Sequence, residues 1–335
     1  RAVPLLIFPP WINKFYILDL TAEKSFIRWA VEQGITVFVA SWKNADESIA
    51  DATIDTYVEE GILQAVSVAR EICQTEGVHT IGYCVAGTTL SAAMAVLEAR
   101  GQASQIASAT FFTAQVDFAD AGELKFFVDD PSVETLDKMT EDKHVLDGRF
   151  MATTFNLLRS KDLIWNYVVN NYMLGKDYFP FDLLYWNSDA TNVPAKWHQQ
   201  YIKDMYRNNL LVKPGALTVC GVPIDLKTVK TPTFIQAGKE DHIAPAKSAF
   251  KLTKAFSGET RFVLAGSGHI AGVVNPPSAK KYQHWTGDSA AATLEDFIAS
   301  GTETKGSWWP HWLTWLTPRS GKQVKPRVPG EGPYK

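Results

Sequence analysis

Residues 81–88 read Ile-Gly-Tyr-Cys-Val-Ala-Gly-Thr, and this stretch decides the fold of the chain. It begins as a short β-branched strand, reaches a lone cysteine at position 84 and continues as a helix. Gly82 and Ala86 lie two residues before and after Cys84, and small residues there let a strand and a helix pass closely at a strained turn. Such a turn holds the thiol at the carboxyl edge of a sheet. We interpret the stretch as a nucleophile elbow that carries sulfur.

The residue after the cysteine supplies a second feature of such a turn. The backbone N–H of Val85 lies at the start of the predicted helix, where a negatively charged oxygen is favoured. Val85 is therefore predicted as one donor of an oxyanion hole. A buried cysteine is also among the commonest core residues, so this motif alone leaves a structural role for Cys84 open.

An acid and a base follow the cysteine in the order in which one fold arranges its catalytic residues. The strand predicted at 231–238 is followed by Asp241, and the strand predicted at 261–264 is followed by a glycine-rich loop that ends in His269. Taken singly, each of these residues is equally consistent with a solvated loop or a capping position. The order Cys, Asp, His, each after a predicted parallel strand, is that of the catalytic triad in the α/β-hydrolase fold.

We therefore predict Cys84 as the nucleophile, His269 as the base and Asp241 as the acid. His242 is the only rival histidine, and its position next to Asp241 predicts a supporting role. Strands alternate with helices in most of the chain, which is typical of a mostly parallel, doubly wound sheet. The predicted strands are 3–8, 35–41, 106–113, 231–238 and 261–264, together with the elbow strand, and the predicted helices are 24–33, 52–73, 88–100, 246–256 and 290–299.

The alternation stops in the middle of the chain. We predict an α/β-hydrolase core from residues 1–116 and 227–318, an inserted cap at 117–226 and an irregular tail at 319–335. The cap is rich in aromatic residues, including Trp165, Tyr167, Tyr172, Tyr178, Tyr185, Trp186 and the Phe at 126, 127, 179 and 181. We expect most of them to pack in the cap's own core, and the rest to face a greasy substrate or a second subunit.

Three tryptophans near the end of the chain share one helical face. Trp308, Trp312 and Trp315 follow the i, i+4, i+7 spacing, and they are expected to dock their helix onto the sheet.

Composition excludes several classes of protein. The 335 residues are 46% hydrophobic, yet no apolar run reaches the roughly 18 residues that span a bilayer. A net charge of −3 without a basic tract excludes a nucleic-acid partner. The cysteines at 73, 84 and 220 form no paired framework and no metal-ligand spacing, which predicts a reducing cytoplasm and no metal site. The chain begins almost inside its first strand, so we expect a fragment of a longer protein.

Several motifs together resemble the polyhydroxyalkanoate synthases, most closely their class I, short-chain branch. The matching motifs appear in the family's order at 9–20, 41–44, 82–88, 186–192, 239–242, 268–272 and 306–309. The synthase motif usually reads Gly-x-Cys-x-Gly-Gly, and Ala86 replaces the first of the paired glycines. The upstream domain of such synthases is not found in this sequence, so a catalytic domain alone is expected.

The resemblance implies polymerisation of (R)-3-hydroxyacyl-coenzyme A, with 3-hydroxybutyryl-coenzyme A as the expected substrate. Coenzyme A is the leaving group, no bound cofactor is expected, and a homodimer working at the surface of cytoplasmic polyester granules is implied. Cys84 would be loaded as a thioester after His269 takes the thiol proton. Asp241 either orients the imidazole or helps to deprotonate the attacking hydroxyl.

The second oxyanion donor is expected in the loop after the first strand. Pro9 and Pro10 have no N–H, so the candidates are Trp11 and Ile12, and we predict Ile12. No residues for the coenzyme A phosphates can be chosen from the sequence.

Two other classes of function remain open. A cysteine-dependent esterase of the dienelactone-hydrolase type would use the same three residues with water as the acceptor. A non-catalytic reading treats the fold as a granule-surface or partner-binding module in which Cys84 is merely buried.

Overall fold

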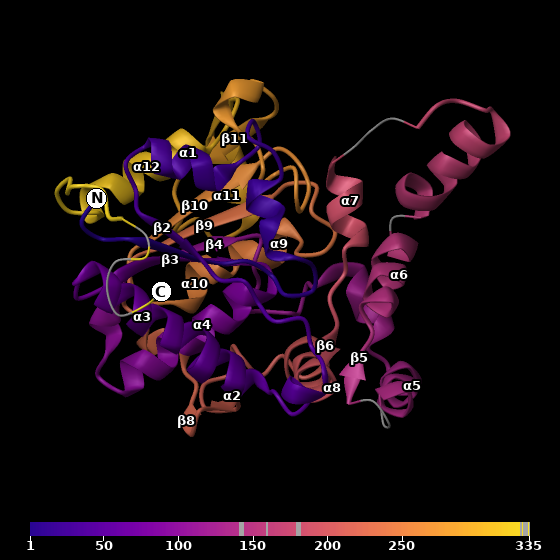
Figure 1. Ribbon diagram of the computed structural model, residues 1–335, viewed down its shortest axis with the longest axis horizontal. Coiled ribbons are helices and arrows are strands. Elements are labelled where there is room, and N and C mark those ends of the chain that lie inside the picture. The colour runs from indigo at the N-terminus through magenta and orange to yellow at the C-terminus, as the bar shows by residue number, and fades with distance from the viewer. Residues whose placement is uncertain (141–143, 159, 179–181, 329, 331–333, 335) are drawn as a thin grey trace.

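An eight-stranded sheet forms the centre of the molecule (Figure 1). The computed structural model describes all residues except 141–143, 159, 179–181, 329, 331–333 and 335. The strand order is β12-β11-β10-β9-β4-β3-β1-β2, and every neighbouring pair from β2 to β10 is parallel. The strands are β1 (Leu5–Phe8), β2 (Val37–Val39), β3 (Val78–Tyr83), β4 (Ile106–Phe112), β9 (Thr233–Gly238), β10 (Thr260–Ala265), β11 (Gln283–Thr286) and β12 (Thr302–Lys305).

Helices cover both faces of this sheet, as the predicted doubly wound fold requires. Side chains alternate between the faces of each strand, so Leu6 and Phe8 belong to one buried cluster while Leu5 and Ile7 belong to the other. The first face carries α3 (Gln64–Cys73), α4 (Val85–Ala99), α9 (Ala246–Phe250), α10 (Leu252–Ala255) and α11 (Leu294–Ser300), and the second carries α1 (Phe26–Glu32) and α12 (Trp309–Leu316).

The tryptophans near the end of the chain dock as predicted. Trp308 and Trp312 are fully buried and Trp315 is nearly so, in the cluster that covers the second face. The indole N–H of Trp312 donates to Thr110 Oγ1 of β4 at 3.0 Å, which ties α12 to the middle of the sheet.

Two details of the predicted sheet are wrong. The strand expected at 35–41 as a buried element is the short β2, whose residues are only half-buried because it lies at the sheet edge with one neighbour. The sequence predicts 261–264, which is β10, as the last strand. Two further antiparallel strands, β11 and β12, follow β10 and extend the sheet. β12 has the sequence Thr-Glu-Thr-Lys and is exposed throughout, so it carries no apolar pattern to predict.

The remaining helices are shorter or irregular. The helix predicted at 52–73 is a continuous run of α2 (Ile54–Thr56), a π-helix η3 (Tyr57–Leu63) and α3. Short 3₁₀ helices are η1 (Phe15–Asp19), η2 (Glu47–Ile49), η4 (Ala103–Gln105), η5 (Gly122–Phe127), η9 (Leu226–Thr228), η10 (Pro277–Ala279) and η11 (Thr317–Arg319). In the described part of the chain, no helix combines the length and the apolar composition needed to cross a membrane.

The segment between β4 and β9 forms a separate layer beside the sheet, drawn from magenta to salmon in Figure 1. It contains α5 (Asp130–Thr140), α6 (Gly148–Leu158), α7 (Asp182–Ser188), α8 (Ala195–Gln200), the π-helices η6 (Lys161–Trp165), η7 (Val168–Met173) and η8 (Tyr201–Arg207), and the strand pairs β5 (Val145–Leu146) with β6 (Val193–Pro194) and β7 (Thr218–Val219) with β8 (Val222–Pro223). The helical residues of 160–178, which we call the arm, project away from the sheet.

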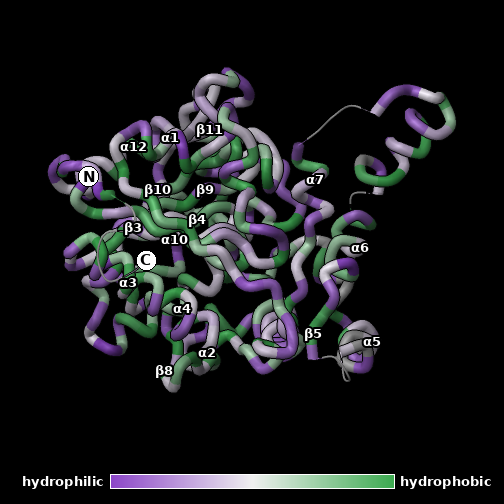
Figure 2. The backbone as a smooth tube through the Cα atoms, viewed as in Figure 1, coloured by the Kyte–Doolittle hydropathy of each residue, from purple (hydrophilic) through white to green (hydrophobic). Residues whose placement is uncertain are grey.

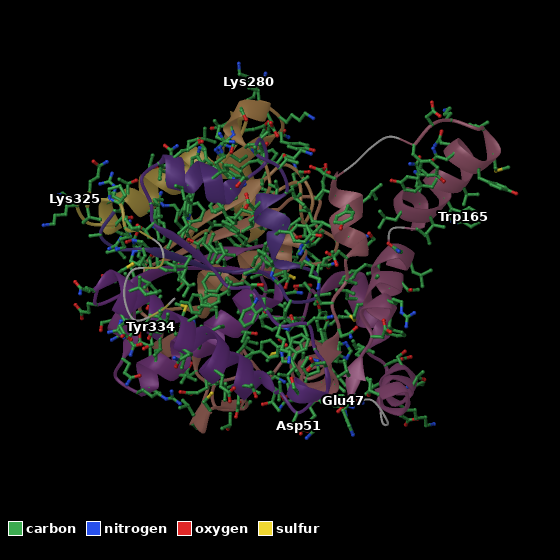
Figure 3. All side chains as sticks on the ribbon, in the orientation of Figure 1. Glu47, Asp51, Trp165, Lys280, Lys325 and Tyr334 are labelled. Carbon is green, nitrogen blue, oxygen red and sulfur yellow. The ribbon has the colours of Figure 1, made fainter. Side chains whose placement is uncertain are left out.

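The arm departs from the expectation that cap aromatics pack in the cap's own core, whereas Phe118, Trp197, Tyr201 and Tyr206 elsewhere in the cap are buried. Trp165 is 59% exposed and Tyr172 is 87% exposed, and Tyr178 and Tyr185 are exposed as well, whereas Trp186 is buried. Hydrophobic stretches of the arm stand apart from the central sheet (Figure 2), and Trp165 lies on this outlying segment (Figure 3). The arm projects away from the sheet, so its Trp165, Tyr172 and Tyr178 remain on the surface, while the exposed Tyr185 lies on α7. The prediction also covers the Phe at 126, 127, 179 and 181, whose side chains are not among those that the structure describes.

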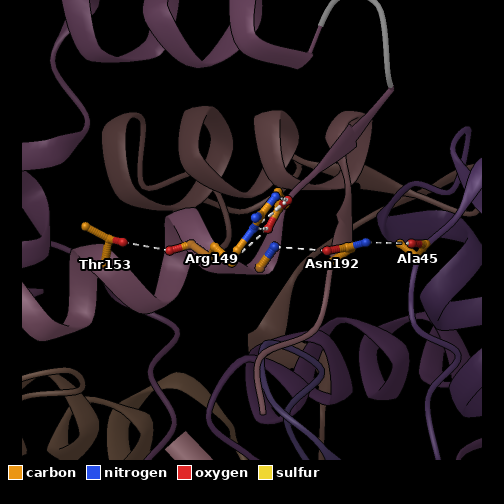
Figure 4. A network of polar contacts seen from close by, with 6 residues as sticks. Ala45, Arg149, Thr153 and Asn192 are labelled. Carbon is orange, nitrogen blue, oxygen red and sulfur yellow. Dashed lines mark hydrogen bonds and ion pairs between the residues drawn. The ribbon is translucent and has the colours of Figure 1, made fainter. Parts of the chain in front are cut away.

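Asn192 fastens the cap to the core (Figure 4). Its side-chain Oδ1 accepts a hydrogen bond from the backbone N–H of Gly148 at 3.0 Å, and its Nδ2 donates to the carbonyl of Ala45 at 3.3 Å. Its own backbone N–H donates to Asn44 Oδ1 at 2.7 Å. Asn44 and Asn192 both belong to the motifs that resemble the synthases, and their role here is to join the start of α6 to the core.

Candidate active site

Cys84 occupies a strained turn between β3 and α4. Its φ of 53° and ψ of −124° lie in a region that side chains rarely adopt. A Cβ added to Gly82 would meet the Cα of Gly87 at 2.6 Å, and one added to Gly87 would meet Ala114 Cβ at 2.5 Å. The turn therefore has the geometry expected of the elbow, but the critical close approach is between Gly82 and Gly87. Ala86 is fully buried and its methyl group is accommodated.

Asp241 and His269 meet at the ends of the neighbouring strands β9 and β10. The imidazole Nδ1 of His269 lies 2.7 Å from Asp241 Oδ2. The second carboxylate oxygen, Oδ1, accepts the backbone N–H groups of Ile243 at 2.8 Å and Ala244 at 2.9 Å. The Asp241 side chain is fully buried and that of His269 is 10% exposed, so neither belongs to a solvated loop. Glu240, by contrast, is exposed.

The charges around His269 favour its protonated form. Burial lowers the pKa of His269, but the neighbouring charges of Asp241 and Cys84, and hydrogen bonds with both, outweigh it and raise the pKa to about 10. An ionised carboxylate can only accept hydrogen bonds, so Nδ1 carries a proton toward Asp241 and Nε2 is the nitrogen available to sulfur. The structure thus brings together the three residues predicted from the sequence.

Tyr83 contacts the loop of His269, a contact that the sequence did not reveal. Its hydroxyl donates to the backbone carbonyl of His269 at 3.0 Å, and the two rings lie 5.7 Å apart. Burial raises the pKa of Tyr83 well above its ordinary value, so the hydroxyl keeps its proton. The residue before the cysteine therefore joins the elbow strand to the histidine loop. Its direct adjacency to Cys84 is the only signal in the sequence.

Two cavities meet at the cysteine. The first, which we call the cap cavity, has a volume of about 310 Å³ and includes Val85, Met151 and Trp197 in its wall. The second, which we call the histidine cavity, has a volume of about 290 Å³ and includes Tyr83, Leu183, Leu184, His242 and His269. Both cavities share four residues, which are Ile12, Cys84, Phe155 and Ile243.

The loop that carries Ile12 is held by the cap. The carbonyl of Ile12 accepts the backbone N–H of Thr191 at 3.2 Å, and the indole of Trp186 donates to the carbonyl of Lys14 at 2.8 Å. Tyr16 donates to Asp189 Oδ2 at 2.7 Å. The motifs at 9–20 and 186–192 thus form one clasp, although they lie far apart in the sequence. This clasp keeps Ile12 beside Cys84.

Among the remaining histidines, His198 lines the cap cavity together with Cys84, and His79 serves the fold. His79 is fully buried between Ser108 and Ser320, at 2.8 and 3.2 Å. His284 lies in β11, and its Nδ1 is 3.1 Å from the backbone carbonyl oxygen of Gly306. No cluster of three or more His, Cys, Asp or Glu side chains suited to a metal ion occurs among the residues that the structure describes.

A family model confirms the fold class. The model described as "alpha/beta hydrolase fold" matches residues 8–276. The chain belongs to the α/β-hydrolase family. In this fold the nucleophile, the acid and the base follow one another along the chain, and Cys84, Asp241 and His269 follow β3, β9 and β10 in that order.

The α/β-hydrolase chain is also similar to several polyester polymerases. It is 50% identical to "Poly(3-hydroxyalkanoate) polymerase subunit PhaC" of Rhizobium meliloti (strain 1021), covering 98% of this chain and 53% of that protein. It is 50% identical to "Poly(3-hydroxyalkanoate) polymerase" of Methylorubrum extorquens, over 98% and 54%, and 46% identical to the subunit PhaC of Cupriavidus necator, over 100% and 58%. The resemblance seen in the motifs is confirmed. The chain spans about half the length of these curated relatives.

Proposed function

We propose that this chain is the catalytic part of a poly(3-hydroxyalkanoate) polymerase that transfers (R)-3-hydroxyacyl groups, with 3-hydroxybutyryl-coenzyme A as the substrate. The observation that carries the proposal is the paired Asp241 and His269 beside a thiol held at a strained elbow. The similarity to named polymerases over nearly the whole chain supports it.

The first step loads the cysteine. The Cys84 thiolate, whose proton has passed to His269, attacks the thioester carbonyl of the substrate. A new carbon–sulfur bond forms to Cys84, the bond to the coenzyme A sulfur breaks, and the imidazolium returns its proton to that sulfur. Exchange of one thioester for another is close to isoenergetic, so a thiol suits this step better than a hydroxyl.

The second step forms the polyester bond. A 3-hydroxyl group attacks the Cys84 thioester, His269 takes the hydroxyl proton, and the freed thiol is regenerated with the ester as product. Both oxygens of Asp241 are already engaged, one by His269 and the other by two backbone N–H groups. This geometry supports an orienting role for Asp241 over direct contact with the hydroxyl.

The backbone N–H groups of Val85 and Ile12 are proposed as the oxyanion hole. Val85 is the first residue of α4, where the backbone N–H groups lack helical partners, and both residues line the cap cavity beside Cys84. His242 lines the histidine cavity, which is consistent with its proposed supporting role.

The partners proposed from the sequence fit the surface of the molecule. Coenzyme A leaves as a product and no bound cofactor takes part. The exposed aromatics of the arm, above all Trp165 and Tyr172, offer an apolar surface for a second subunit in a homodimer. The place of action is proposed as the surface of polyester granules in the cytoplasm.

One incubation tests donor, reaction and product together. The protein is mixed with 3-hydroxybutyryl-coenzyme A while free thiol and turbidity are followed, and the products are separated. Thiol release with rising turbidity is expected. Release of thiol with free 3-hydroxy acid and no polymer would favour the hydrolase reaction.

A separate alkylation experiment tests the non-catalytic reading. Slow alkylation of Cys84 by iodoacetamide at neutral pH, no faster than that of Cys73 and Cys220, would favour a non-catalytic module.

A further inference from the structure

The Cys84 thiol lies where the cap cavity and the histidine cavity meet, so a group bound to sulfur has two possible directions. The two cavities are similar in volume, and size alone does not choose between them. One difference between their walls concerns the proposed base. His269 lines the histidine cavity and is not among the described residues that line the cap cavity.

Proton transfer decides which reactants occupy the histidine cavity. The leaving coenzyme A sulfur takes a proton from the imidazole, and the attacking 3-hydroxyl gives one to it. Both atoms must therefore come within hydrogen-bond reach of His269. The leaving group and the incoming hydroxyl are thus placed on the histidine side of Cys84, one after the other.

The acyl chain then needs a different direction. Val85, whose N–H faces the proposed oxyanion, lines the cap cavity only. The wall of this cavity also carries Val128, Phe150, Met151 and Val193, which are apolar side chains suited to an alkyl group. A chain directed there leaves the histidine side open for the next reactant.

We propose that the cap cavity holds the acyl chain carried on Cys84, and that Met151 limits the length of that chain. The inference rests on the proposed function, because it takes the ligand to be a 3-hydroxyacyl thioester. Met151 is partly buried on α6 and packs against the main core, and its long flexible side chain occupies space that a smaller residue would open. The ligand class is an acyl group with an alkyl side chain.

The first test compares two donors of different length. The ratio of kcat/KM for 3-hydroxyoctanoyl- over 3-hydroxybutyryl-coenzyme A is measured by free thiol for the wild type, Met151→Ala and Leu183→Ala. Leu183 is the matched control, since it is also partly buried but lines only the histidine cavity. Met151→Ala is expected to raise the ratio about tenfold, and Leu183→Ala to leave it unchanged. A shift confined to Leu183→Ala, or equal in both variants, would overturn the assignment.

A second test needs no polymerase activity. Cys84 is alkylated by N-ethyl and N-octyl iodoacetamide, which form a thioether and release iodide, and the two rates are followed by mass spectrometry. Met151→Ala is expected to speed the octyl reagent relative to the ethyl reagent, whereas Leu183→Ala is not. If this pattern holds while neither acyl donor releases thiol, the proposed function fails and the cavity assignment stands. The reverse pattern overturns the assignment whatever the donors do.

Discussion

The carboxyl edge of the central sheet and the arm of the cap place their residues in opposite ways. At the sheet edge the Asp241 side chain is fully buried and makes three hydrogen bonds, while on the arm Tyr172 is 87% exposed. The first region is held by neighbouring strands and the second projects from the body (Figure 1). A residue at the carboxyl edge of the sheet is therefore held in one place, whereas the arm leaves large apolar side chains exposed. Replacements in the two regions should have separable effects.

The largest effect is expected at Cys84, at the carboxyl edge of the sheet. Cys84→Ala removes the sulfur that carries the acyl group, so release of coenzyme A should fall by about 10⁶-fold, the scale seen when a nucleophile is lost. The fold should persist, because alanine keeps a Cβ in the same turn. Thiol release and circular dichroism are measured together.

Cys220→Ala is the control, since this partly exposed cysteine lies outside both cavities. It should keep full activity. Retained turnover in Cys84→Ala would contradict the proposed mechanism.

The next largest effect is expected from Asp241→Asn. An amide in place of the carboxylate removes the charge that stabilises the imidazolium of His269 and favours the wrong tautomer, which costs about 10⁴-fold in a related triad. Because both proton transfers use His269, acylation of Cys84 and transfer to the hydroxyl should slow together. Rapid-quench mass spectrometry of the Cys84 thioester separates the steps. Normal acylation with slow elongation would show instead that Asp241 activates the hydroxyl.

The elbow itself gives a test of packing rather than chemistry. In Gly87→Ala the new methyl group would lie 2.5 Å from Ala114 Cβ and 2.8 Å from the carbonyl of Gly82, so a loss of about 1–3 kcal/mol in the free energy of unfolding is expected. Ala86→Gly is the matched control and restores the usual synthase motif. It should lose only about 0.5–1 kcal/mol, from helix propensity. Urea unfolding measures both, and equal losses would mean that Ala86 is the critical neighbour.

The sheet edge was predictable because its pattern is local. A β-branched strand, small residues and a following helix place Cys84 at the sheet edge, and glycines around His269 mark its loop. No local pattern in the sequence indicates the arm. Aromatic residues such as Trp165 are usually buried, so the sequence alone predicts them to be core residues. The clasp between 9–20 and 186–192 is held by hydrogen bonds to backbone carbonyls and by the bond from Tyr16 to Asp189. Strand β12 consists of polar residues. Neither region shows a periodic apolar pattern in the sequence.

A smaller effect is expected at Tyr83. Tyr83→Phe keeps the buried ring but leaves the carbonyl of His269 without this donor, which should cost about 1–3 kcal/mol in the free energy of unfolding. If the hydroxyl also positions the imidazole, kcat should fall more than KM changes and the alkaline limb of the rate profile should move. Tyr334→Phe, at an exposed tyrosine, is the control. A loss of stability with an unchanged pH profile would limit Tyr83 to a structural role.

The smallest effect on folding is expected on the arm. The double replacement Trp165→Ser and Tyr172→Ser changes exposed side chains only, so the free energy of unfolding should move by less than about 0.5 kcal/mol. The same change removes two large apolar side chains from the proposed subunit surface, so the dimer should be weaker. Sedimentation velocity should therefore show it dissociating at a higher protein concentration than the wild-type dimer does. Tyr282→Ser, at an exposed aromatic on the sheet side of the molecule, should leave association unchanged. If the arm variant associates like the wild type, the arm is not the subunit surface and a second chain must bind elsewhere.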